Sequence, residues 1–275
     1  MAIRTRKFIV DTTLRDGEQS PSVNFTQQQK LEIASLLDGA GVSQIEAGIP
    51  AASIDEKQTI CQIINRCKHA KIAVWSRLAL NDLQQCMDCE PDMIHISIPI
   101  SDIQIYSKLR KNRHWITEQL FACLEILIDH QINVKHISIG FEDAFRADNA
   151  FLIEICKILL DFNIKRIRLA DTVGTVFPSL CREKFAKLSE ETGYRGQFGF
   201  HGHNDLGMSL ANTIEALKCS CNYADTTLLG IGERTGNCDF QQLVSVTQPI
   251  FDFGLTAERA MEVQTEFLKI IHQAA

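Results

Sequence analysis

Residues 134–172 read VKHISIGFEDAFRADNAFLIEICKILLDFNIKRIRLADT, which predicts a strand, a helix and a second strand. The two ends, 134–142 and 166–172, are short runs with β-branched and other apolar residues, as in β-strands. The middle, 151–162, is a longer apolar run whose length favours a helix. Apolar strands joined by a helical crossover indicate a parallel sheet that is buried on both faces.

The same alternation of a short apolar run and a longer helical pattern occurs eight times along the chain. The predicted strands are Phe8–Asp16, Gln44–Pro50, Lys71–Leu78, Met93–Ser101, Val134–Glu142, Arg166–Thr172, Gln197–Asp205 and Tyr223–Gly232. Eight units in about 250 residues are the number and size of a (β/α)8 barrel. We therefore predict an α/β fold, with a catalytic TIM barrel over residues 1–255 and a short trailing helix over 256–275.

An open doubly wound sheet is the alternative to a barrel. Such a sheet typically has a glycine-rich phosphate turn after its first strand, and residues 15–19 (RDGEQ) contain no such turn. The glycines of 230–236 follow the last strand instead, so they do not match a dinucleotide fingerprint.

The first predicted helix, Thr26–Gly39, has signals at both ends. Thr26 and Gln29 have the spacing of a capping box, in which the two residues satisfy each other's backbone N–H groups. Gly39 is the type of residue that ends a helix.

Composition excludes several classes of protein. The chain has 275 residues, 45% hydrophobic, with 28 basic and 34 acidic side chains and a net charge of −6. We therefore expect neither a nucleic-acid nor a membrane partner. No apolar stretch reaches the roughly 18 residues of a bilayer span, and no signal-peptide pattern follows Met1–Arg6. These features predict a cytoplasmic protein.

The chain has ten cysteines, too few for a disulfide scaffold at this length, so we expect reduced thiols. Two pairs, Cys86–Cys89 and Cys219–Cys221, raise the question of structural zinc. Neither has a second Cys or His pair nearby at zinc-finger spacing, so we do not predict structural zinc.

Polar residues should mark the site at the carboxyl ends of the barrel strands. His201 and His203 are two apart on a predicted strand, so both imidazoles project from one face. Such a pair is either two loop or core histidines or two metal ligands.

Closure of the barrel favours the interpretation of the two histidines as metal ligands. The first, seventh and eighth strands are then consecutive around the ring, so Asp16 and the loop after the eighth strand face the histidine pair. That loop offers Glu233 and Asn237. Two His, a carboxylate and an amide oxygen suit an exchangeable Zn²⁺, Mn²⁺ or Mg²⁺ ion.

Four further polar residues each have two interpretations. Arg15 forms a rim ion pair or neutralises charge on a substrate carbonyl oxygen. Glu142 is a paired rim carboxylate or a proton-handling group. Thr172 caps the next helix or holds a substrate carboxylate. His95, inside an apolar run, is a satisfied core histidine or a substrate contact.

Three segments carry a family resemblance: 11–19 (DTTLRDGEQ), 201–205 (HGHND) and 230–237 (GIGERTGN). In this order they resemble the signature of the DRE-TIM metallolyase superfamily, within it the 2-isopropylmalate, homocitrate and citramalate synthases. The segment 95–104 (HISIPISDIQ) is most similar to the homocitrate synthases of nitrogen-fixation systems.

The resemblance implies an acyltransferase that condenses acetyl-CoA with a 2-oxo acid in a Claisen reaction and then hydrolyses the thioester. Asp16, His201 and His203 are implied as ligands of a divalent metal ion, with Asn237 near or in its coordination shell.

The resemblance also implies roles for the residues around the metal. Arg15 contacts the polarised carbonyl oxygen and Thr172 holds the substrate carboxylate. Gln19 and His95 line the substrate, and Glu142 matches a family carboxylate near the acyl group.

Two departures from the family pattern matter. Ser138 stands where the lysine-pathway homocitrate synthases carry an arginine for the distal carboxylate of 2-oxoglutarate. Pyruvate and a branched 2-oxo acid therefore stay open beside 2-oxoglutarate. Family synthases also continue into helical subdomains that bring a His and Tyr pair into the neighbouring subunit's site. We expect a homodimer, or a complex with a separate chain that supplies this region.

Two other functions remain as alternatives. One is a metal-dependent carbon–carbon lyase or aldolase like the HMG-CoA lyases, which carry a cysteine in a glycine loop after the eighth strand. Cys238 lies in the corresponding loop. The other is a metal-binding barrel without catalysis that serves as a partner subunit.

Overall fold

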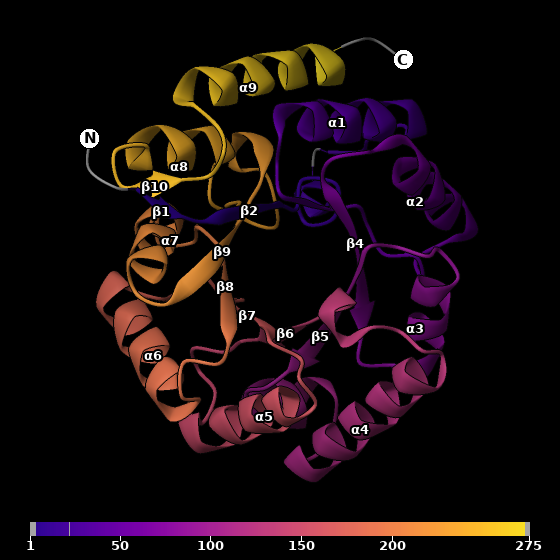
Figure 1. The fold of residues 1–275 in the computed structure, drawn as a ribbon, viewed down its shortest axis with the longest axis vertical. Coiled ribbons are helices and arrows are strands. Elements are labelled where there is room, and N and C mark those ends of the chain that lie inside the picture. Colours follow the sequence, from indigo (N-terminus) through magenta and orange to yellow (C-terminus); the bar gives the residue numbers. More distant parts are fainter. Residues whose placement is uncertain (1–3, 22, 273–275) are drawn as a thin grey trace.

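Eight parallel strands close into a ring in the order in which the chain makes them (Figure 1). The computed structural model describes residues 4–21 and 23–272. The barrel strands are β2 (Phe8–Asp11), β3 (Gln44–Glu46), β4 (Lys71–Arg77), β5 (Met93–Pro99), β6 (Ile137–Glu142), β7 (Arg166–Asp171), β8 (Gln197–Gly202) and β9 (Cys221–Thr226). The last strand pairs with the first, with Phe8 opposite Tyr223. The predicted (β/α)8 barrel is confirmed.

Helices surround the ring on its outer side (Figure 1). They are α1 (Gln27–Ala40), α2 (Ile54–Arg66), α3 (Leu80–Met87), α4 (Arg113–Asp129), α5 (Asn149–Asp161), α6 (Pro178–Glu191), α7 (Ser209–Lys218), α8 (Phe240–Thr247) and α9 (Ala257–His272). Shorter helical turns are Gly17–Gln19, Ile103–Lys108, Val134–His136 and Leu228–Gly230. Within the described residues, no helix has the length and apolarity to cross a membrane.

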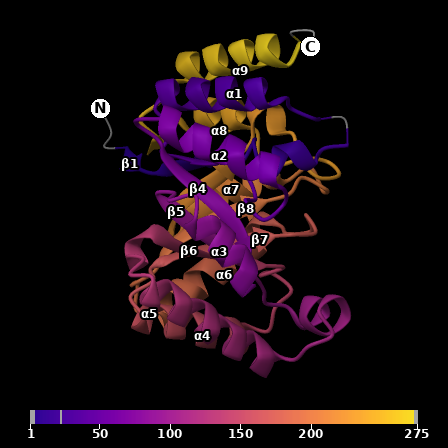
Figure 2. The same ribbon diagram turned by 90° about the vertical axis from the view of Figure 1, so that its right-hand side faces the viewer.

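The helix α9 follows the eighth unit and packs against α1 and α8 (Figure 2). It occupies the place of the predicted trailing helix, of which residues 273–275 lie outside the described part. Residues 1–3 of the predicted barrel lie outside it as well. The division of the chain at residue 255 remains a prediction.

Four of the predicted strands run three or more residues too far, because the chain turns earlier than the predicted pattern ends. β2, β3, β8 and β9 stop at Asp11, Glu46, Gly202 and Thr226, so His203 lies just after its strand. The predicted strand Val134–Glu142 instead starts too early, since Val134–His136 is a helical turn. After β2, the backbone N–H groups of Arg15, Asp16 and Gly17 all donate to the carbonyl oxygen of Thr12, at 3.1, 2.8 and 3.1 Å. This turn, rather than a strand, presents Arg15 and Asp16 at the mouth of the barrel.

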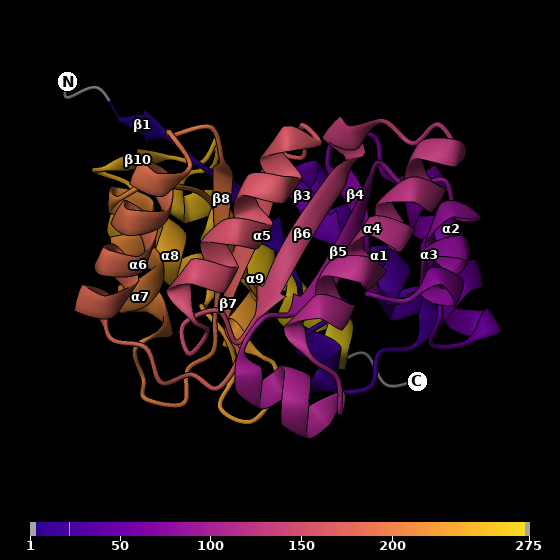
Figure 3. The ribbon, with the colours of Figure 1, turned by 90° about the horizontal axis from the view of Figure 1, so that it is seen from below.

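A small second sheet was not predicted. β1 (Thr5–Arg6) pairs with β10 (Phe251–Asp252) near the end of the barrel where the strands begin, at the upper edge in Figure 3. The helix before β10, α8, stops at Thr247. Strands of two residues are too short to produce a periodic pattern.

Helix α1 confirms the predicted capping box. The Thr26 hydroxyl accepts a hydrogen bond from the Gln29 backbone N–H, and the Gln29 side chain accepts one from the Thr26 N–H. The helix end differs from the prediction, because Gly39 lies in the last turn and Gly41 forms the cap. Gly41 has φ of 87°, a left-handed conformation that glycine adopts without a steric penalty.

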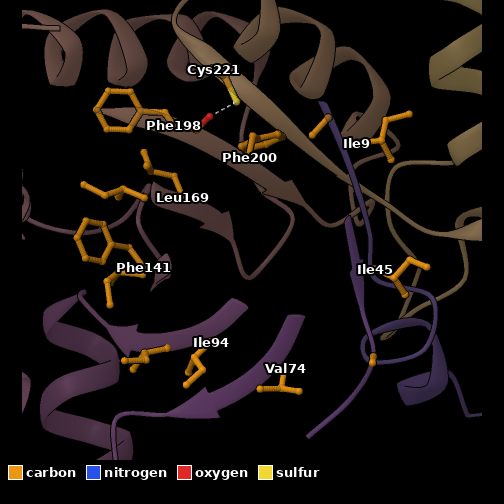
Figure 4. Close-up of a cluster of buried hydrophobic side chains, with 14 of the residues drawn as sticks. Ile9, Ile45, Val74, Ile94, Phe141, Leu169, Phe198, Phe200 and Cys221 are labelled. Atoms are coloured by element: carbon orange, nitrogen blue, oxygen red, sulfur yellow. Dashed lines mark hydrogen bonds between the residues drawn. The ribbon is translucent and has the colours of Figure 1, made fainter. Parts of the chain in front are cut away.

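The two faces of the strands differ in polarity. Outward-facing side chains pack under the helices and are at most 3% exposed (Figure 4): Ile9, Ile45, Val74, Ile94, Phe141, Leu169 and Phe198. Residues that alternate with these line a hollow inside the ring, and several are polar or charged: Gln44, His95, Ser138, Arg168 and Asp225. The apolar layer therefore stabilises the fold, and the polar and charged side chains of the strands gather inside the ring.

The apolar layer can be tested at Phe185 of α6, which contacts Phe145, Phe198 and Phe200 edge-on. We expect Phe185→Ala to reduce the free energy of unfolding by about 3–5 kcal/mol, because it leaves a cavity among buried rings. Phe177, at the start of the same helix and 50% exposed, is the matched control. Urea denaturation measures both variants, and equal losses would contradict this account of the core.

Candidate metal centre and active site

The candidate metal centre lies where β8, β9 and β2 are next to one another in the ring (Figure 1). His201 Nε2 and His203 Nε2 lie 3.3 Å apart. The Asp16 Oδ2 atom is 3.7 Å from the first nitrogen and 3.5 Å from the second. All three residues are buried. In the described part of the chain they form the only group of three or more His, Cys, Asp or Glu side chains that fits a metal ion.

Hydrogen bonds on the far side of each ring fix the histidine tautomers. His203 Nδ1 lies 3.0 Å from the carbonyl oxygen of Thr172, and His201 Nδ1 lies 3.1 Å from Asp225 Oδ2. Both partners are acceptors, so each Nδ1 carries the proton and each Nε2 presents its lone pair. Two lone pairs that face each other beside a carboxylate repel one another unless a cation lies between them. The donor set therefore fits a divalent metal ion.

Burial and neighbouring charges shift the pKa values of these groups in different directions. Burial opposes ionisation of Asp16, yet Arg15 and then His203 hold the pKa of the carboxyl well below its usual range. Burial lowers the pKa of His201, which keeps that imidazole neutral. Burial also acts to lower the pKa of His203, but its hydrogen bond with Asp16 outweighs burial and raises it.

Asn237 reaches the same centre, whereas Glu233 does not. The Asn237 amide donates to Asp16 Oδ2 at 2.6 Å and to the carbonyl oxygen of Ile231 at 3.0 Å. Its Oδ1 atom is buried without a hydrogen-bond partner. Glu233 instead forms an ion pair with Arg234 at 2.7 Å and is partly exposed. The candidate ligand from this loop is therefore the amide.

Arg15 begins a chain of buried charges that crosses the barrel. Its guanidinium donates to Asp16 Oδ1 at 2.7 Å and to Glu46 Oε1 at 2.5 Å. Glu46 also accepts from Arg168 at 2.8 Å, and Arg168 donates to Asp225 Oδ2 at 2.6 Å. We call these residues, together with the His201 that Asp225 contacts, the buried ion network: Asp16, Arg15, Glu46, Arg168, Asp225 and His201.

Glu46, Arg168 and Asp225 were missed in the sequence analysis. A signal was present, because each is a charged residue inside a strand predicted to be buried. A charge in such a strand needs a partner on the same side of the sheet. The sequence does not show which charges become neighbours, since the partners lie on different strands.

His95 is buried, and its two nitrogens differ. Nδ1 lies 2.7 Å from the Ser138 hydroxyl, whereas Nε2 has no hydrogen-bond partner. Burial lowers the pKa of the ring well below its ordinary value, so His95 is neutral. The imidazole packs closely against Gly140, where a side chain would collide with Nε2. The unpaired nitrogen is consistent with a substrate contact, and the role of His95 remains a prediction.

The three remaining candidates lie around the mouth of the barrel. Glu142 accepts hydrogen bonds from Ser97 at 2.9 Å and Lys108 at 3.2 Å. The Thr172 hydroxyl accepts from the Asp143 backbone N–H at 2.8 Å, which leaves its own proton free to donate. Gln19 and Arg15 line a common hollow of about 250 Å³. The roles of all these residues remain predictions.

Cys238 does not have the surroundings of a reactive thiol. Its side chain is fully buried, and burial raises the pKa of the thiol to about 12. A nucleophilic cysteine requires a lowered pKa and access to substrate. These observations disfavour thiol chemistry in this loop.

Fold and site together define a (β/α)8 barrel with a candidate divalent-metal centre at the carboxyl ends of its strands. Residues 6–264 match the HMGL-like family model, and the chain belongs to the HMGL-like family. The predicted relationship to the DRE-TIM group is thereby confirmed.

The curated relatives are synthases. The chain is 40% identical over 242 residues to the homocitrate synthase subunit alpha of Clostridium pasteurianum, with 88% of each chain covered. It is 39% identical to the homocitrate synthase of Frankia alni, covering 85% of this chain and 65% of that protein. It is 34% identical to 2-isopropylmalate synthase 2 of Caldanaerobacter subterraneus subsp. tengcongensis, covering 93% and 66%. The chain thus spans slightly less than two thirds of the latter two relatives. These similarities support a transferase of this type.

Among solved structures, the HMG-CoA lyase of Pseudomonas aeruginosa resembles the chain with a TM-score of 0.83. The alignment covers 100% of this chain and 96% of that one, at 15% sequence identity. At such low identity the similarity shows the fold alone.

The buried ion network predicts a pH-dependent stability. Burial opposes ionisation of Glu46, but Arg15 and Arg168 outweigh it and hold the pKa of this carboxyl below its ordinary value of 4.5. Near pH 4.5 the unfolded chain therefore binds a proton at Glu46, whereas the folded chain does not. The stabilisation that this carboxylate gives the folded chain is complete above that range and is lost as the pH falls through the lower pKa of the folded state.

We expect Glu46→Gln to lower the free energy of unfolding at pH 7 by about 3 kcal/mol, because two guanidinium groups lose a buried partner. The loss of stability between about pH 5 and pH 3 should also become shallower. Urea titrations at several pH values measure both effects. Glu191→Gln, which removes an exposed pair with Lys157, is the control and should change stability by about 0.5 kcal/mol or less. A Glu46→Gln variant as stable as the parent chain would refute the network's role.

The contact between Asp225 and His201 predicts a weaker metal site in Asp225→Asn. We expect the affinity for Mn²⁺ or Zn²⁺ to fall about 10- to 100-fold, because the imidazole loses the acceptor that orients it. Equilibrium dialysis measures the affinity. Asp239→Asn is the control, since asparagine caps α8 as well as the Asp239 carboxylate does. Equal metal affinity in both variants would exclude this orienting role.

Proposed function

We propose that the chain is the barrel of an acyltransferase that condenses acetyl-CoA with a 2-oxo acid. The supporting observation is the group of Asp16 and two imidazole nitrogens directly beside the Arg15 guanidinium. Asp16, His201 and His203 would hold a divalent ion, Mn²⁺, Mg²⁺ or Zn²⁺, with Asn237 Oδ1 as a further donor. Such an ion supplies Lewis acidity to the carboxylate and carbonyl oxygens of a 2-oxo acid.

Arg15 is the group that we propose for charge stabilisation. Its side chain is only 8% exposed, and two carboxylates hold it in place. In such surroundings a fixed guanidinium donates to the substrate carbonyl oxygen as negative charge develops there, without a cost of reorganisation. Burial acts to lower its pKa, but Glu46 and Asp16 outweigh burial and raise it, so Arg15 stays charged.

Three residues are proposed to position the 2-oxo acid. The Thr172 hydroxyl donates to the substrate carboxylate, since its oxygen already accepts from the Asp143 N–H. The neutral His95, whose buried Nε2 has no hydrogen-bond partner, is proposed to line the substrate, and Gln19 borders the hollow beside Arg15.

The proposed reaction has two parts. The methyl carbon of acetyl-CoA loses a proton, the resulting enolate carbon bonds to C2 of the 2-oxo acid, and the former carbonyl oxygen gains a proton. Water then cleaves the thioester to a carboxylate and free CoA thiol. We propose that Glu142 lies near the acyl group and orients this water, held by Ser97 and Lys108.

We propose that a second chain completes the site and supplies the base that removes the methyl proton. It is either a second copy of this chain or a separate polypeptide. The name of the Clostridium pasteurianum relative, a subunit alpha, supports an assembly of more than one kind of chain.

The proposed 2-oxo acid is 2-oxoglutarate, on the basis of the similarity to homocitrate synthases. Ser138 hydrogen-bonds to His95 in the barrel interior and provides no cation for a distal carboxylate. Pyruvate and 2-oxoisovalerate are therefore tested beside it.

The test is release of free CoA thiol from acetyl-CoA with Mn²⁺, Mg²⁺ or Zn²⁺ and each of the three 2-oxo acids. We expect release with one acid and none in Asp16→Ala, whereas Asp55→Ala, an exposed residue of α2, serves as the active control. Arg15→Lys should reduce kcat about 10²–10³-fold through the lost transition-state contact.

Thiol release that survives Asp16→Ala would contradict the proposed metal centre. If this chain released no thiol with any of the three acids, either alone or mixed with a second chain, the result would favour a metal-binding subunit without catalysis.

A further inference from the structure

A second hollow lies at the opposite end of the barrel from the metal centre. Its volume is about 300 Å³, and its lining includes the first residues of β4, β7 and β8: Lys71, Arg166 and Gln197. The strands begin at this end, the upper edge in Figure 3, and the metal centre lies beyond their carboxyl ends. None of Asp16, His201 and His203 lines this hollow, although Arg166 and Tyr223 border both it and the interior beside His95.

The charges around this hollow are all of one sign. Lys71, Lys135, Lys165 and Arg166 line it, and no Asp or Glu does. Within residues 4–21 and 23–272, none of these four cations forms an ion pair with a carboxylate. The chain as a whole carries a net charge of −6, so this concentration of positive charge departs from its overall balance. A concave surface of one charge raises the local concentration of the opposite ion.

Arg166 gives the hollow a partly buried guanidinium with unused donors. It lies over the Tyr223 ring, 3.4 Å from the ring centre, and donates to Gln44 Oε1 at 2.9 Å. Burial lowers the pKa of the guanidinium. Arginine has five N–H donors, so most of them have no acceptor among the described side chains.

Arg168, two residues further along the same strand, provides an internal comparison. It projects from the same face of β7 and contacts both Glu46 and Asp225. Burying a cation is costly unless an anion accompanies it. Arg168 has its anions within the chain, whereas Arg166 has only an amide oxygen and a hollow beside it.

We propose that this hollow binds a small oxyanion with at least two negative charges, either a phosphate group or a dicarboxylate. A guanidinium carries parallel N–H groups that match two oxygens of such a ligand, and the exposed Lys135 and Lys165 contribute further positive charge to the lining. The proposal does not depend on the proposed condensation reaction, because it concerns other residues.

The test is calorimetric titration of the full chain with inorganic phosphate and, separately, with succinate, at low ionic strength. The Lys135→Ala, Lys165→Ala double variant should bind about tenfold more weakly or worse, with its thermal stability unchanged because both lysines are exposed. Lys187→Ala, an exposed lysine of α6, is the matched control and should bind as the parent chain does. Stronger binding of phosphate indicates a phosphorylated ligand, and stronger binding of succinate a dicarboxylate.

His203→Ala separates this hollow from the metal centre and should keep full affinity for the anion. Three results would overturn the proposal: no binding of either anion up to about 10 mM, unchanged affinity in the double variant, or loss of binding in His203→Ala.

Discussion

The arrangement of the barrel interior depends on pairing charges that have no access to water. Glu46 is completely buried between two arginines, and Asp225 is buried between Arg168 and His201. Removing one member would leave another buried charge without a partner, which costs several kcal/mol. Because the members come from different strands and from the turn after β2, their pairing also fixes how these parts of the ring face one another.

The same contacts orient the residues of the candidate metal centre. Asp225 holds the Nδ1 proton of His201, and Arg15 holds one oxygen of Asp16 while the other faces the imidazoles. The candidate ligands are thus already oriented, which is what the proposed site needs if it is to stabilise charge without rearrangement. A buried ion network contributes little net stability compared with an apolar core, so its value in this barrel lies in orientation.

The sequence predicted the fold and the candidate metal ligands because both depend on local patterns. Eight repeats of strand and helix indicate a closed ring, and closure brings Asp16 to a histidine pair that is distant along the chain. Strand ends were less predictable. β2, for example, is followed by a turn in which three backbone N–H groups donate to the Thr12 carbonyl oxygen, and the apolar pattern does not show this turn. The Glu46–Arg168 contact was not predictable at all, because it joins side chains 122 residues apart across the barrel.

The contrast between Arg166 and Arg168 follows from the same requirement for pairing. Both side chains project into the ring from β7, and neighbours on other strands decide what each one meets. Arg168 contacts the carboxylates of Glu46 and Asp225, whereas Arg166 contacts the Gln44 amide oxygen and the Tyr223 ring. The buried Arg168 is thus neutralised within the chain, whereas Arg166, one layer further toward the start of the strands, has no carboxylate partner among the described residues. We attribute this difference to a ligand that supplies the missing negative charge. In the proposed site, an anion from solution pairs with Arg166 as Glu46 pairs with Arg168, and the positive charges of Lys135 and Lys165 attract it to the hollow.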